Sequence, residues 1–277
     1  MFSGMFSGFM AGTWAESTIM AVVAGAVGFF VVMRGATFAA HAIPQGAFTG
    51  AAGAALVGAG TTLGVGVFSL IGVVTIAALG RRGRHDVVTA LCLVALLGTG
   101  ALFLSMSTGY SGQTFSLLFG QPLVIGPSEI LPTVAVGAAC LGLVALVYRP
   151  LVLSTISPEL AAAQGSRPQR IELSFLLAVG AVTTMALPVV GALLVFSLMI
   201  GPPAAARHFT HRPLAAMVLS AALAVVTVWA SIAASFWSNW PIGFFVAGLG
   251  AVWYVAGRTW ARWRRGPLPG GRAVVLS

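Results

Sequence analysis

Single side chains, not clusters, supply the chemistry available in this 277-residue sequence. Its four histidines are the first candidates for metal binding, because imidazole is a common ligand for zinc and other transition metals. His85, His208 and His211 lie beside arginines, and nearby positive charge disfavours cation binding. His41 follows a long apolar segment and has no such neighbours, and an ionisable side chain there is costly and often functional. Two interpretations stay open for His41: a metal ligand that lines a pathway, or a histidine satisfied by backbone groups.

The sequence offers no means of catalysis. Lysine is absent, so the phosphate-binding lysine of a P-loop cannot be supplied. No cluster of His, Asp, Glu, Ser or Cys of the kind that a membrane enzyme needs is visible. Cys92 and Cys140 lie inside apolar runs, where we expect small core residues and no disulfide. We therefore predict a protein that is not an enzyme and binds no cofactor.

The composition is that of a membrane protein. Hydrophobic residues make up 58% of the chain and charged residues 7%, whereas soluble domains carry about a quarter charged residues. All fourteen basic residues are arginines, in five groups between apolar segments: Arg34; Arg81 to Arg84; Arg149 to Arg170; Arg207 and Arg212; Arg258 to Arg272. The net charge of +9 therefore indicates topology and not nucleic-acid binding, because cytoplasmic loops retain positive side chains during insertion. With nine crossings every arginine lies on one face, which predicts an N-terminus outside and a C-terminus in the cytoplasm.

Seven apolar stretches carry these crossings, since one crossing needs about 20 residues. Five are candidates for single spans: Trp14–Val32, Val87–Leu104, Ile130–Val147, Leu214–Ser235 and Ile242–Val255. Two longer blocks, Gly46–Leu79 and Leu173–Ala206, contain breakers at Gly60-Thr61-Thr62 and at Leu187-Pro188. We predict that each is a tight pair of short helices, so the fold is an all-α bundle. If the second block crossed the membrane once, the arginines before and after it would face opposite sides, so the charge distribution supports two crossings. Only Arg34 constrains the first block, which leaves eight crossings in total as an alternative.

The largest polar insertion on the arginine face is expected to contain a short helix. Ser157 is a candidate N-cap, Pro158 suits the first turn, Glu159 favours the positive helix end, and Gly165 can close the helix. Such a helix between two spans needs something to pack on. Either a cytoplasmic partner binds it, or it lies on the bundle surface.

Three stretches resemble one known family. The first runs from Phe29-Phe30-Val31-Val32-Met33-Arg34-Gly35 to His41. In the second, from Tyr148 to Gly165, Ser-Pro-Glu-Leu-Ala stands where the family has Asp-Pro-Glu-x-Ala. The third joins Val-Gly-Ala-Leu-Leu-Val at 190–195 to Pro-Pro-Ala-Ala-Ala-Arg at 202–207. Together they are similar, over roughly residues 9–257, to the ABC-3 family of binding-protein-dependent metal-ion permeases.

The resemblance implies the membrane half of a type II ABC importer in the bacterial plasma membrane. Two copies would form the path, an ABC ATPase subunit would supply ATP hydrolysis, and an extracytoplasmic solute-binding protein would deliver zinc, manganese or iron. Residues 1–257 would be the permease domain and 258–277 a basic cytoplasmic tail. The helix that couples the ATPase to the path would carry Ser157, Pro158, Glu159, Leu160, Ala161 and Gly165.

The segment after the first span departs from the family pattern. The family has Gly-Asp-Ala-x-Ser-His where this chain has Ala36-Thr37-Phe38-Ala39-Ala40-His41. Thr37 thus replaces a carboxylate, and Ala40 replaces a serine. Losing a hard oxygen ligand weakens the expectation of a family-like metal site.

The role of four proline and glycine positions and the class of transporter each allow more than one interpretation. Pro188, Gly191, Pro202 and Pro203 are either gating hinges or helix ends, since neighbouring helices can satisfy carbonyls freed by proline. The alternatives to a metal importer are an ABC permease for a non-metal substrate and a secondary transporter driven by an ion gradient. The latter usually needs carboxylates near mid-membrane, and we expect none there because Glu16 and Glu129 are assigned to the outer face.

Overall fold

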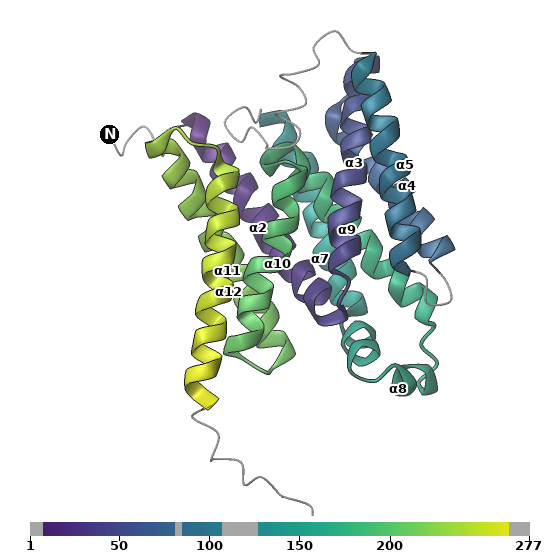
Figure 1. Cartoon of the computed structure of the whole chain (residues 1–277), viewed down its shortest axis with the longest axis vertical. Coiled ribbons are helices and arrows are strands. Elements are labelled where there is room, and N and C mark those ends of the chain that lie inside the picture. The colour runs from purple at the N-terminus through teal and green to yellow at the C-terminus, as the bar shows by residue number, and fades with distance from the viewer. Residues whose placement is uncertain (1–7, 81–84, 107–126, 266–277) are drawn as a thin grey trace, which may run out of the picture.

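The structure is a computed structural model in which residues 8–80, 85–106 and 127–265 are described (Figure 1). All the regular structure in these ranges is helical. Nine long helices and one short one follow each other along the chain: α2 (Gly8–Arg34), α3 (Thr37–Val57), α4 (Thr61–Leu79), α5 (His85–Ser105), α7 (Pro127–Ile156), α8 (Pro158–Ala163), α9 (Pro168–Val190), α10 (Ala192–Phe209), α11 (Pro213–Ser238) and α12 (Ile242–Arg265).

The long helices alternate in direction, and this brings the described arginines to one end of the bundle. Arg34 at the end of α2 contacts Glu172 near the start of α9, and Arg207 near the end of α10 donates to the Val32 carbonyl oxygen of α2 at 3.1 Å. At the opposite end, Trp14 of α2 packs edge-to-face on Trp229 of α11. The sorting of charge predicted from the sequence is therefore confirmed for the arginines in the described ranges, and the end that carries them is called the arginine end below.

Seven of the helices are long and apolar enough to cross a membrane: α2, α4, α5, α7, α9, α11 and α12. The two remaining long helices, α3 and α10, are the partners of α4 and α9 in the two predicted helical pairs. Both blocks therefore fold as pairs of helices, as expected. The first pair starts earlier than predicted, at Thr37 and not at Gly46, because α3 continues through Pro44.

The two pairs turn at glycines. Gly58 ends α3 in the left-handed region (φ 67°), and Gly60 caps the start of α4, so the first break lies just before the predicted Gly60-Thr61-Thr62. The second break is not at Leu187-Pro188. It falls at Gly191, whose φ of 80° and ψ of 159° form a backbone conformation that is essentially restricted to glycine. Proline near the end of α9 thus leaves the helix intact, and the positive φ three residues later ends it.

Small residues let the helices approach closely. A Cβ atom on Gly50 of α3 would collide with the Gly64 carbonyl of α4, and one on Gly64 would collide with the Gly50 carbonyl. The two helices therefore meet backbone to backbone, as small residues allow at helix interfaces in lipid.

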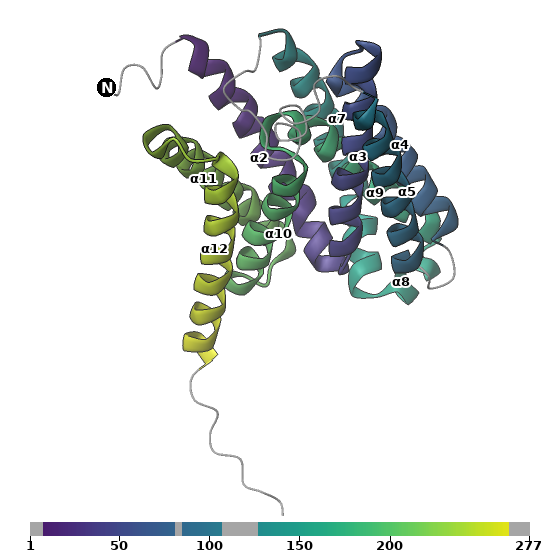
Figure 2. The same ribbon diagram turned by 45° about the horizontal axis from the view of Figure 1, so that its top comes forward.

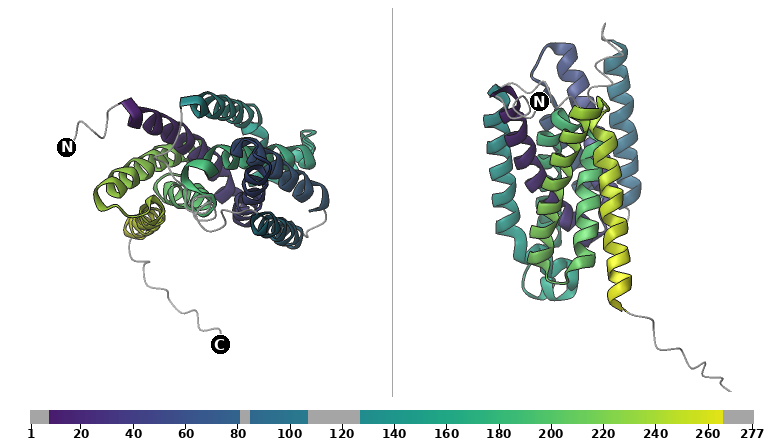
Figure 3. Two further views of the ribbon diagram at one scale, coloured as in Figure 1. Left: turned by 90° about the horizontal axis from the view of Figure 1, so that it is seen from above. Right: turned by 90° about the vertical axis from the view of Figure 1, so that its left-hand side faces the viewer.

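The core is centred on α2, α9 and α10, whose buried side chains form one cluster that includes Phe29, Phe30, Phe175 and Leu198. In contrast, only a small part of the α5 and α7 spans is buried. Figures 1 and 2 show that α2 crosses the bundle obliquely, and seen from above it runs from the edge toward the middle (Figure 3). α2 therefore packs on helices that lie on both sides of it: α7 and α9 on one, α10 and α11 on the other.

Candidate coupling face and pathway residues

The short helix predicted on the arginine end is present as α8. The Ser157 hydroxyl accepts a hydrogen bond from the Leu160 N–H at 3.4 Å, Pro158 occupies the first turn, and Glu159 adds negative charge there. At its other end Gly165 has a φ of 77°, and the N–H groups of Gly165 and Ser166 bond to the carbonyls of Ala162 and Ala161. This paired bonding is the Schellman arrangement that ends helices at a left-handed glycine. The capping prediction is therefore confirmed at both ends.

α8 presents most of its surface away from the bundle. Ala161 is buried, whereas Glu159 is exposed and Leu160 is 56% exposed. Figure 1 places α8 at the lower end of the bundle, where α7 and α9 are connected. An exposed leucine beside a carboxylate on a capped helix is a surface that another protein can bind.

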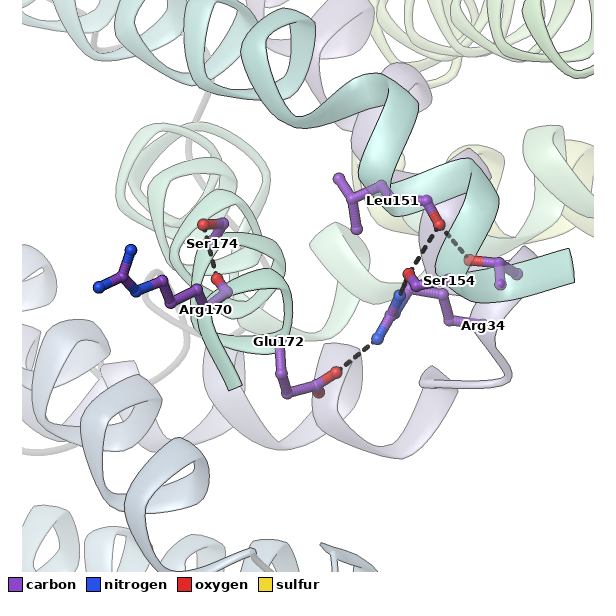
Figure 4. Close-up of polar contacts among 7 residues, drawn as sticks. Arg34, Leu151, Ser154, Arg170, Glu172 and Ser174 are labelled. Atoms are coloured by element: carbon purple, nitrogen blue, oxygen red, sulfur yellow. Dashed lines mark hydrogen bonds and ion pairs between the residues drawn. The ribbon is translucent and has the colours of Figure 1, made fainter. Parts of the chain in front are cut away.

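A polar network ties α2 to the ends of α7 and α9 that flank α8 (Figure 4). An Arg34 Nη atom lies 2.6 Å from a Glu172 carboxylate oxygen, and the other Nη donates to the Ser154 hydroxyl at 3.0 Å. The guanidinium also lies over the Phe175 ring, 5.2 Å from its centroid. Because Ser154 belongs to α7 and Glu172 to α9, one arginine holds together the two helices that flank α8. No local sequence pattern predicts this pairing, because 138 residues separate Arg34 from Glu172.

His41 lies in the second turn of α3, seven residues after Arg34. Its ring contacts the Phe196 ring of α10 edge-to-face, with centroids 4.7 Å apart. Its Nδ1 atom is buried and has no hydrogen-bond partner within the described ranges. The side chain is therefore not satisfied by backbone at that nitrogen. Gln45, one turn further along α3, is also buried.

Metal ligands do not gather around His41. Thr37, which stands at the family's carboxylate position, is exposed at the start of α3. No group of three or more His, Cys, Asp and Glu side chains that could hold a metal ion occurs in the part of the chain that the structure describes. His41 thus offers one nitrogen ligand within a single copy of the chain.

The candidate hinge residues lie in α9 and α10. Pro202 and Pro203 are inside α10 and not at its end, so the helix-end interpretation is wrong for them. Proline at 203 leaves the Met199 carbonyl without its helical donor, and Gly28 of α2 packs directly on that carbonyl, where a Cβ atom would come within 2.5 Å. Pro188 lies in the last turn of α9, and Gly191 joins α9 to α10. The α9–α10 pair thus contains a helix break at Gly191 and a turn weakened by proline inside α10.

The expectation that the spans contain no carboxylate is wrong for Glu16. Glu16 is 2% exposed, lies inside the α2 span, and accepts a hydrogen bond from the Thr133 hydroxyl of α7 at 2.6 Å. Thr13 and Ser17, on the same face of α2, are equally buried. The signal was present in the sequence, because polar residues at positions 13, 16 and 17 have the spacing of one helix face.

Comparison with known proteins identifies the family to which this fold belongs. A model of the ABC 3 transport family matches residues 7–259. The chain belongs to the ABC 3 transport family. It is thus a permease subunit of an ABC transporter and a multi-pass protein of the bacterial plasma membrane, as the three motifs predicted.

Individual relatives cover most of the permease. It is 29% identical over 219 residues to the manganese transport system membrane protein MntC of Halalkalibacterium halodurans, covering 77% of this chain and 74% of that one. It is 24% identical over 199 residues to the high-affinity zinc uptake system membrane protein ZnuB of Haemophilus influenzae, covering 70% and 76%. Its fold matches PsaBC from Streptococcus pneumoniae, solved in complex with Fab, with a TM-score of 0.82, 22% identity and coverage of 92% and 93%.

Proposed function

We propose that this permease carries a divalent transition metal ion into the cell, powered by a separate ATPase subunit that docks on α8. Manganese and zinc systems among the relatives support the cargo class. The observation that carries the coupling proposal is α8 itself, a helix capped at both ends and exposed beyond the bundle. Ser157, Pro158, Glu159, Leu160, Ala161 and Gly165 form the docking helix, and ATP is bound by the partner.

The Arg34 network gives α8 a route to the pathway. A force on α8 acts on the ends of α7 and α9, and Ser154 and Glu172 connect both ends to Arg34. Only Gly35 and Ala36 separate Arg34 from the start of α3, which carries His41. Movement of α8 would therefore shift the α2–α3 turn and, with it, the imidazole. This is a chain of direct contacts, not a correlation between distant sites.

His41 would act on the cargo as a transient ligand. Its buried Nδ1 has no protein partner within the described ranges, so a passing cation would find a free nitrogen. A pathway must bind its ion weakly enough to release it, and one imidazole from each of two copies meets that requirement better than a closed cage. Pro188, Gly191, Pro202 and Pro203 would let α9 and α10 change their packing as the path opens.

The remaining features of the proposed importer rest on the charge distribution and on the family resemblance. Nine crossings result if α3 and α10 are added to the seven apolar spans, and the arginine end then faces the cytoplasm with the C-terminus. The N-terminus lies outside, a solute-binding protein delivers the ion there, and two copies form the path. Residues 1–257 would be the permease domain, and the basic tail at 258–277 would begin within α12, which ends at Arg265.

Two observations favour alternative substrates or energy sources. Thr37 and Ala40 remove oxygen ligands that the family pattern has, which favours an ABC permease for a non-metal substrate. Glu16 is a buried carboxylate inside a span, a feature of transporters driven by an ion gradient. Membership of the ABC 3 family weighs against the second alternative.

Uptake measurements separate these functions. A strain that lacks the chain should contain less manganese or zinc than the parent strain, and re-expression should restore the content. Uptake should stop on ATP depletion and continue when the ion gradient is collapsed. Unchanged content of manganese, zinc and iron would refute the cargo, while uptake that follows the gradient and not ATP would refute the ABC mechanism.

A further inference from the structure

A cavity of about 380 Å³ opens between three helices on the side of the bundle. Ala26 of α2 forms its floor. The walls are formed by α7 and α11, and the lining residues from these are Leu141, Val144, Ala145, Tyr148, Leu214 and Met217. Apart from the Tyr148 hydroxyl, every lining side chain is apolar. We call it the α2–α7–α11 groove.

The groove lies toward the arginine end and opens to the outside of the bundle. Leu214 is the second residue of α11, and Tyr148 lies about two turns before the end of α7. Leu214 is 58% exposed, and Ala145 is also exposed. From Tyr148 to Leu141 the groove extends about 10 Å toward the bundle centre. α7 and α11 both pack on α2 and lie on either side of it (Figure 3).

Two arginines lie next to groove-lining residues near the arginine end. Arg149 follows Tyr148 directly, and Arg212 is the N-cap of α11, two residues before Leu214. Both side chains are exposed, and neither forms an ion pair with any residue that the structure describes. The first N–H groups of α11 also point to this end, since a helix leaves these donors without partners inside the helix.

We propose that the groove binds one anionic phospholipid, with an acyl chain along the apolar walls and the phosphate between Arg149 and Arg212. An acyl chain matches an apolar lining that faces the membrane interior, and basic pockets between spans at the cytoplasmic face recognise lipid headgroups. A second copy of the chain fits less well, because its own arginine end would bring like charge to the same mouth. The proposal goes beyond transport and does not depend on the cargo.

The test is lipid retention by the purified full-length protein, measured by native mass spectrometry after exposure to phosphatidylglycerol or to phosphatidylcholine with the same acyl chains. Ala145→Trp fills the groove from an exposed position. Leu146→Trp is its matched control, because Leu146 is the next residue of α7, is 83% exposed, and does not line the groove. Arg149→Gln combined with Arg212→Gln removes the headgroup contacts, and Arg258→Gln combined with Arg262→Gln removes two exposed arginines elsewhere at the same end.

We expect the wild type to retain phosphatidylglycerol in preference to phosphatidylcholine, and Ala145→Trp to lose the bound lipid while Leu146→Trp keeps it. The Arg149/Arg212 double variant should lose about 30-fold in phosphatidylglycerol affinity, since each arginine beside an anionic headgroup contributes about a factor of five. The Arg258/Arg262 variant should retain wild-type affinity. Equal retention by the two tryptophan variants, or equal losses in the two arginine pairs, would overturn the proposal. A second copy in the groove would also overturn the proposal. In that case Ala145→Trp would convert a dimer to a monomer with no change in bound lipid.

Discussion

Replacing Arg34 with glutamine tests the network that connects α2 to the two helices flanking α8. The substitution removes the ion pair to Glu172, the hydrogen bond to Ser154 and the contact with the Phe175 ring. Replacing Glu172 with glutamine removes only the first of these. The two single variants and the double variant form a cycle that isolates the energy of the ion pair.

The expected magnitude follows from partial burial. An exposed ion pair contributes about 0.2–1 kcal/mol, whereas removing one partner of a buried pair costs about 3–5 kcal/mol. The side chains of Arg34 and Glu172 are 17% and 26% exposed, so we expect a coupling free energy of about 2 kcal/mol, between these limits. Arg34→Gln should cost about 0.5–1 kcal/mol more than Glu172→Gln, because it also loses the cation–π contact.

The measurement is thermal unfolding of the purified protein in one detergent. For a chain of this size about 2 kcal/mol corresponds to a fall in Tm of about 4–8 °C. Arg170→Gln is the control: Arg170 lies two residues before Glu172, is exposed, and points away from the pair in Figure 4. Its Tm should change by less than about 2 °C. If Arg34→Gln and Arg170→Gln lower Tm equally, or if the effects of the two network variants simply add, the ion pair does not fasten α2 to α9.

Three other predictions test the remaining parts of the structure. Glu159→Arg should abolish uptake while leaving Tm within about 2 °C of wild type, because Glu159 is exposed; full uptake would remove the docking role of α8, and a large fall in Tm would show that Glu159 supports the fold. His41→Ala should lower uptake of manganese or zinc more than tenfold at low external metal, whereas the neighbouring exposed Thr37→Ala should not; equal uptake in both variants would exclude His41 from the pathway. Gly64→Ala should prevent α3 from packing on α4 and lower Tm or abolish folding. Gly142→Ala, where a Cβ atom meets no neighbouring atom, should leave Tm unchanged or raise it slightly. Equal Tm values for the two variants would contradict the close backbone contact.

Local patterns in the sequence determined the class of this protein, the helical pairs and the capped helix α8. Apolar runs and arginine groups act on each segment independently, because membrane insertion depends on hydropathy and flanking charge. Capping is equally local: the bonds from the Leu160 N–H to the Ser157 hydroxyl and from the Ser166 N–H to the Ala161 carbonyl close within one or two turns. The family motifs added the transporter class, which the matched family model confirms.

Tertiary structure alone decided which polar residues meet. Glu16 was not expected inside a span, yet α2 carries it there and α7 covers it with Thr133, 117 residues away. Arg34 was treated as a loop charge, yet it bridges α7 and α9. The groove between α2, α7 and α11 depends on the oblique path of α2, which no local pattern encodes. Hydropathy fixes how far each helix lies along the membrane normal, but side-chain packing between helices distant in the chain fixes their tilt and neighbours.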